Sequence, residues 1–139
     1  NATQTKVDLV GEITRAEGYA RLLGLGASPG LQLRIAAPID VLDSRVPNGV
    51  LRALIDGVTA GGREAAVVDI SLRPDDDDLL AHARASGMAP DDQDGLARLA
   101  AYVTQGTIEL LPLSSELRVR IRAARTHLAS RARLAELLA

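Results

Sequence analysis

The apolar and polar positions of this chain predict short strands that alternate with helices. Residues 31–35 alternate apolar and polar side chains with a period of two, which is typical of a strand with one more buried face. Residues 65–70 form an apolar run rich in β-branched side chains, interrupted by Asp69 and ending before Pro74. Such a run predicts a strand buried on both faces. Two further strands are predicted over residues 7–13 and 107–111.

The helices are predicted from apolar periodicity and from residues that favour helix ends. Apolar side chains over residues 50–59 recur at offsets of three, four and seven, as on one face of a helix. Thr14 and Glu17 have the spacing of a capping box, which predicts a helix start at Thr14. The four carboxylates of Asp75–Asp78 favour the first turn of another helix, because they stabilise the positive end of its dipole. Predicted helices therefore cover residues 14–23, 50–59, 75–86 and 90–106.

The C-terminal residues predict a long helix over 115–138. Apolar residues follow one another there at spacings of four and three, with Arg131 in one slot of the series, as in the seam of a short coiled coil. The seam residues are Leu117, Ile121, Ala124, Leu128, Ala135 and Leu138. They predict either a homodimer interface or a contact with a fused or partner signalling domain. Alternatively, the first half of this helix packs on the sheet and only its end is free.

Together these elements predict an α/β fold. Alternating strands and helices with a continuously apolar inner strand favour a three-layer, doubly wound and mostly parallel sheet of 4–5 strands, with helices on both faces. We expect an irregular N-terminus over residues 1–6, the α/β domain over residues 7–114, and a linker or dimerisation helix over residues 115–139.

Composition narrows the class of protein. A length of 139 residues suits one domain, and an aromatic share of 1% requires an aliphatic core. Many single-stranded nucleic-acid binders stack bases on aromatic side chains, which this chain almost lacks. A nucleic-acid role is therefore not expected, although residues 115–139 carry six Arg and only two Glu. Cysteine is absent, and no apolar run reaches the roughly 20 residues of a membrane helix. We expect a cytoplasmic protein without a membrane anchor.

Three carboxylates are candidates for a metal site. Crevices in open α/β sheets form at the carboxyl ends of strands, where Asp40, Asp69 and Asp75 could converge on Mg²⁺. Asp40 and Asp75 suit helix or turn caps equally well. A Ser-His-Asp relay of Ser71, His82 and Asp78 lacks the Gly-x-Ser-x-Gly elbow, so His82 is expected to be a surface histidine. No catalytic residue is assigned, and an enzyme is the less favoured interpretation.

Two stretches of the chain resemble the receiver domain of bacterial two-component response regulators. The first is Val67-Val68-Asp69-Ile70-Ser71-Leu72, with a Pro two residues on and an acidic segment after it. The second is residues 106–112, Gly-Thr-Ile-Glu-Leu-Leu-Pro, followed by Glu-Leu-Arg-Val-Arg-Ile-Arg over 116–122 and a run through residues 125–128. The resemblance implies that Asp69 is the phospho-acceptor.

The chain departs from the receiver pattern at its chemical positions. Where receivers carry an acidic pair for Mg²⁺, it offers Glu12 beside Gly11, and Leu111 stands where the Lys before the last Pro is expected. The resemblance therefore implies a degenerate pseudo-receiver, a non-enzymatic regulatory module that acts by self-association or partner contact. Two alternatives are a Mg²⁺-dependent phosphotransfer site at Asp69 and a small-molecule sensor domain.

Overall fold

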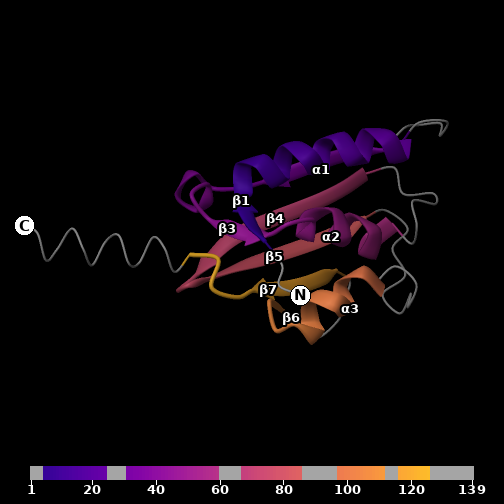
Figure 1. Cartoon of the computed structure of the whole chain (residues 1–139). Coiled ribbons are helices and arrows are strands. Elements are labelled where there is room, and N and C mark those ends of the chain that lie inside the picture. Colours follow the sequence, from indigo (N-terminus) through magenta and orange to yellow (C-terminus); the bar gives the residue numbers. More distant parts are fainter. Residues whose placement is uncertain (1–4, 25–30, 60–66, 86–96, 112–115, 126–139) are drawn as a thin grey trace, which may run out of the picture.

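A computed structural model of the chain describes residues 5–24, 31–59, 67–85, 97–111 and 116–125. These residues form two layers, with helices against one face of a five-stranded sheet (Figure 1). The helices are α1 (Leu9–Gly24), α2 (Val50–Thr59) and α3 (Ala97–Thr104). None of the helices that the structure describes is both long and apolar enough to cross a membrane.

The sheet is mixed. Its strand order is β2-β4-β5-β7-β6. The pair β2 and β4 is parallel, and the remaining three neighbouring pairs are antiparallel. The strands are β2 (Gln32–Ala36), β4 (Val67–Asp75), β5 (Asp78–Ala85), β6 (Ile108–Leu110) and β7 (Leu117–Ile121). A second, two-stranded antiparallel sheet joins β1 (Lys6–Asp8) to β3 (Arg45–Pro47), which follows the short 3-10 helix η1 (Ile39–Val41).

The core lies between the sheet and the helices. Inward side chains of β4, β5 and β7 alternate with outward polar ones and are almost completely buried. On β5 the inward residues include Ala81 and Ala83, whose small side chains let α2 lie close to the middle of the sheet. From α2, the apolar stripe predicted by the sequence is buried against them, namely Leu51, Leu54, Ile55 and Val58.

A buried carboxylate joins α1 to α2. Glu12 of α1 is completely buried, and its Oε2 accepts a hydrogen bond from the amide of Leu51 at 3.1 Å. Its Oε1 accepts from the amide of Gly49 and from Nη2 of Arg52, each at 3.2 Å. Glu12 thus caps the first turn of α2, whose amides have no partner within the helix. Gly49 has φ +87, and a Cβ there would lie 2.9 Å from the hydroxyl oxygen of Tyr102, so this close approach requires glycine.

The predicted doubly wound, mostly parallel fold is wrong. The described sheet has a single parallel pair, β2 with β4, and its helices cover one face only (Figure 1). Two of the predicted helices, over residues 75–86 and 115–138, contain strands where the structure describes them. The strand over 31–35 and the helix over 50–59 are confirmed, and the predicted strand over 107–111 is present as β6.

The helix predicted to start at Asp75–Asp78 is a β-hairpin. Asp75 and Asp78 are paired across β4 and β5, so Asp76 and Asp77 form a two-residue turn. Asp76 adopts φ 53, a left-handed conformation that Asp tolerates better than most residues. Pro74 fits inside β4 because β2 pairs with β4 only as far as Ser71, and no other described strand pairs with β4 on that side.

The predicted C-terminal helix is also wrong where the structure describes it. Residues 117–121 form β7, which lies between β5 and β6. Leu117, Ile121 and Ala124 are fully buried core residues and therefore cannot form a dimer seam on a helix surface. Leu128, Ala135 and Leu138 lie outside the described residues.

The first helix begins earlier than the capping box predicts. α1 starts at Leu9, so Thr14 is inside the helix, and its hydroxyl donates to the carbonyl of Val10 at 3.2 Å. The strand predicted over 7–13 is reduced to β1, because Leu9, Ala16 and Ala20 present a buried helical stripe.

Replacing Glu12 by Gln should destabilise the fold by about 2–3 kcal/mol, because the hydrogen bonds to a charged acceptor are lost in a buried site. Urea unfolding followed by circular dichroism measures the change. Glu17→Gln, on the exposed side of the same helix, is the matched control and should have little effect. Equal effects of the two substitutions would contradict the role of Glu12 as a cap.

Replacing Asp76 by Val should cost about 1–2 kcal/mol of unfolding free energy, since a β-branched residue is strained at positive φ. Asp77→Val, in the same turn but without a positive φ, should cost less. Thermal melting of the two variants tests this difference, and a larger loss for Asp77→Val would refute the turn geometry.

Candidate functional site

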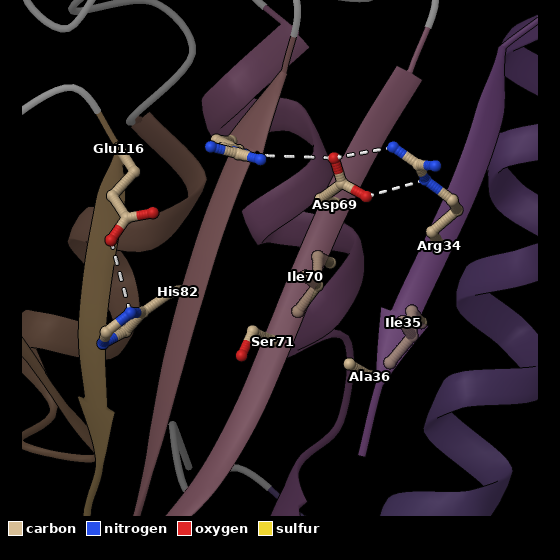
Figure 2. A pocket seen from close by; sticks show the side chains of 9 residues that line it. Arg34, Ile35, Ala36, Asp69, Ile70, Ser71, His82 and Glu116 are labelled. Carbon is tan, nitrogen blue, oxygen red and sulfur yellow. Dashed lines mark hydrogen bonds and ion pairs between the residues drawn. The ribbon is translucent and has the colours of Figure 1, made fainter.

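The face of the sheet opposite the helices, here called the outer face, carries most of the charged side chains of the strands. Its residues alternate with the inward core residues along β2, β4, β5 and β7. A groove of about 420 Å³ lies on this face (Figure 2). Its lining residues are Arg34, Ile35, Ala36, Asp69, Ile70, Ser71, His82, Arg84 and Glu116.

One end of the groove is a row of charges across three strands. Arg34 of β2, Asp69 of β4 and Arg84 of β5 are neighbours in the sheet register. Arg34 binds Asp69 side-on, with Nε 2.8 Å from Oδ1 and Nη2 3.2 Å from Oδ2. Arg84 approaches the same carboxylate less closely, with Nε 3.9 Å from Oδ2. One carboxylate thus lies between two guanidinium groups (Figure 2).

The other end of the groove holds a histidine and a carboxylate. Nδ1 of His82 on β5 lies 3.3 Å from Oε1 of Glu116, which directly precedes β7. Ser71 is the cross-strand partner of His82, yet Figure 2 shows the imidazole directed toward Glu116 and away from Ser71. Backbone amides of paired strands are used in the sheet, so the described strands offer no free backbone amide for an oxyanion beside Ser71. The Ser-His relay drawn from the sequence is therefore not assembled.

Asp69 does not occupy the position that a receiver-like strand would give it. It is within β4, which continues to Asp75, and its side chain lies on the outer face in an ion pair with Arg34. The expectation placed it at the carboxyl end of a strand, where a crevice would open. Here that end of β4 is the hairpin turn.

The three candidate metal ligands are not brought together. Asp69 and Asp75 are six residues apart on one strand, which is about 20 Å at the rise of an extended chain. Asp40 lies in η1. Among the described residues, no group of three or more His, Cys, Asp or Glu side chains is arranged to hold a metal ion.

A cluster around Arg120 was missed at the sequence level. Arg120 of β7 contacts Asp75 at 3.2 Å, Asp78 at 3.8 Å and Glu109 of β6 at 3.0 Å. Partial burial acts to lower the pKa of Arg120, but the hydrogen bonds and charges of Glu109 and Asp75 outweigh it and the pKa is raised. The strict alternation Leu-Arg-Val-Arg-Ile-Arg over 117–122 was the available signal for a strand with an arginine face.

The hairpin turn is held by the residues that follow β7. Oδ1 of Asp78 accepts from the amide of Ala123 at 2.8 Å, and the carbonyl of Asp77 accepts from the amide of Arg125 at 2.8 Å. Nη1 of Arg125 also donates to the carbonyl of Asp76 at 3.2 Å. These contacts and the Arg120 cluster have a structural role, because each ties the acidic turn to the end of β7.

Comparison with known proteins gives a fold match and no sequence match. No protein-family model matches the chain, and no curated protein matches it. The histidine kinase AdeS of Acinetobacter baumannii is similar in structure with a TM-score of 0.56 at 13% identity, over 87% of this chain and 68% of that chain. The catalytic domain of the histidine kinase ThkA gives a TM-score of 0.56 at 12% identity, over 87% of this chain and 96% of that chain.

The comparison establishes a fold and corrects the expected one. The chain has a mixed, five-stranded fold like that of histidine kinase catalytic domains, in place of the doubly wound sheet. Both of these structural neighbours are histidine kinases and neither is a receiver domain.

Replacing Arg120 by Gln should lower the urea midpoint of unfolding, because Asp75, Asp78 and Glu109 would lose the cation that they share. Arg122→Gln is the matched control, since Glu109, at 3.3 Å, is the one carboxylate that Arg122 contacts among the described residues, and Arg122 is more exposed. The loss should be larger for Arg120→Gln. Equal midpoints for both variants would show that the cluster adds nothing to stability.

Proposed function

We propose that this chain is a regulatory domain of a two-component signalling protein, built on the fold of a histidine kinase catalytic domain and acting by contact with a partner domain. The observation that carries the proposal is the extent of the structural likeness. It spans 87% of this chain and 96% of the ThkA catalytic domain, so it covers the arrangement of a whole domain. Fold alone does not assign chemistry, which depends on the residues of a site.

The described carboxylates favour contact over catalysis. A general base must be able to take a proton from a substrate. Glu12, the carboxylate buried in the helix layer, already accepts hydrogen bonds from Gly49, Leu51 and Arg52. On the outer face, Asp69 is bound side-on by Arg34. Both carboxylates thus already accept hydrogen bonds from other groups of the chain.

The charges of the outer face suit a protein contact. Arg73 and Arg84 are exposed there, and Arg34 and Asp69 form an ion pair near the solvent. Exposed ion pairs add little stability, but complementary charges favour encounter with the correct partner and disfavour wrong ones. A homodimer and a fused or separate signalling domain are both partners of this kind.

A second candidate function is a nucleotide-dependent catalytic domain. The ThkA structure is described as a catalytic domain in a nucleotide-free form. If this chain shares that chemistry as well as the fold, it binds a nucleotide. This candidate makes a different prediction about ligand binding.

Titration with Mg²⁺ and ATP separates the two functions. The contact proposal predicts no saturable heat in calorimetry and no transfer of the labelled γ-phosphoryl group to the chain. A nucleotide that binds only the folded state must raise the melting temperature, so thermal melting with and without ATP gives an independent readout. Saturable binding together with a raised melting temperature would overturn the contact proposal in favour of the catalytic one.

A further inference from the structure

The groove on the outer face holds more cationic hydrogen-bonding capacity than its own carboxylates use. Asp69 is the carboxylate that faces both arginines of the groove, and Arg34 occupies both of its oxygens, at 2.8 and 3.2 Å. Arg84 lies 3.9 Å from Asp69, beyond hydrogen-bond distance. Within the part of the chain that the structure describes, its guanidinium group has no closer carboxylate partner.

We propose that this groove binds a small organic anion, with Arg84 as the main ligand for its carboxylate or phosphate group. A guanidinium presents five N–H donors in a planar fork that matches such groups. The Arg84 side chain is 68% exposed and lines the groove, so an incoming anion can reach it. The hydroxyl of Ser71 lines the same groove and is a second possible donor.

The positive charge of the groove lies at one of its two ends. Asp69 is shared between two guanidinium groups, so this row of three side chains has a net positive charge. Glu116 also lines the groove, but its Oε1 lies 3.3 Å from Nδ1 of His82. The positive charge that an anion can reach therefore lies at the end of the groove formed by Arg34, Asp69 and Arg84.

The size of the groove favours an organic molecule over a single inorganic ion. Its volume of about 420 Å³ lies within the roughly 300–1,000 Å³ of small-molecule sites. Ile35, Ala36 and Ile70 also line the groove, next to its charged residues. A ligand with an anionic group and a short carbon skeleton would contact both.

Sheet register makes the site rigid. Arg34, Asp69 and Arg84 are on three hydrogen-bonded strands, so their Cα positions are set by the sheet and not by a loop. The side-on ion pair further restricts Asp69 and leaves Arg84 as the adjustable member. This arrangement resembles a preformed site, in which less conformational freedom is lost on binding.

The test is an amide-resolved NMR titration of the full chain with succinate, and separately with inorganic phosphate. Each is compared with sodium chloride at equal ionic strength, because exposed charges are screened by salt. We expect saturable shifts at residues of β4 and β5 around Ser71 and Arg84. Saturation by succinate indicates a carboxylate ligand, and saturation by phosphate indicates a phosphorylated one; either supports the proposal.

Two variants of equal charge change make the test specific. Arg84→Gln should weaken binding by about tenfold or more, the effect of losing roughly one charged hydrogen bond. Arg73→Gln removes an exposed arginine from the same face of β4 but outside the groove, and should change the dissociation constant less than about twofold. The exposure of both side chains means that neither substitution disturbs the core.

Three results would overturn the proposal. One is the absence of saturable shifts with both anions. Another is equal binding by the original chain and Arg84→Gln. The third is equal weakening by Arg84→Gln and Arg73→Gln, which would show a general charge effect and no defined site.

Discussion

The contact between the buried carboxylate of Glu12 and the first turn of α2 sets the arrangement of the helix layer. A carboxylate without partners is very costly to bury. Here two backbone amides of the α2 start and the guanidinium of Arg52 satisfy it. Since Glu12 belongs to α1, the contact fixes one helix on the other. α2 in turn packs over the middle of the sheet, where the inward alanines of β5 leave room for it.

The two-layer arrangement gives the sheet two different faces. Aliphatic side chains of β4, β5 and β7 point toward the helices and are buried, whereas most of the alternate residues are arginines, carboxylates and His82. No helix covers these polar residues in the described part of the chain. The charged face is therefore the surface on which a partner or a ligand can be recognised, and its ion pairs arrange the side chains that would do so.

Acidic residues in this chain have mainly structural roles where the structure describes them. The hairpin turn places Asp75 and Asp78 close together, a repulsive arrangement that Arg120 and the backbone after β7 offset. This explains why a run of four Asp does not form a metal site here. The chemistry of this chain therefore depends on its own side chains and does not follow from the similarity of its fold to histidine kinases.

Local patterns were sufficient for some elements of the fold. The helix at 50–59 and the strands near 31–35 and 107–111 follow from apolar spacing, because each buries one face in the usual way. The strand predicted over residues 65–70 is present from Val67 as β4, but the prediction that both of its faces are buried is wrong, because Asp69 and Ser71 lie on the outer face. The groove was predictable only in part, since Asp69 was singled out without Arg34 or Arg84, its partners in the register.

By itself, the sequence determined that the chain has an aliphatic core with alternating helical and extended segments. Only the tertiary structure decided whether residues 75–78 and 117–122 form helices or extended chain, and on which face of the sheet the helices lie. In residues 117–122, the four-residue spacing of Leu117 and Ile121 is compatible with a helix, whereas the alternation of Leu117, Val119 and Ile121 with arginines is compatible with a strand. Hydrogen-bonded pairing with β5 and β6 selects the strand. Asp75–Asp78 suit a helix start or a tight turn, and the turn prevails because Arg120, Ala123 and Arg125 provide partners for it. These partners are distant in sequence, so no local pattern contains them.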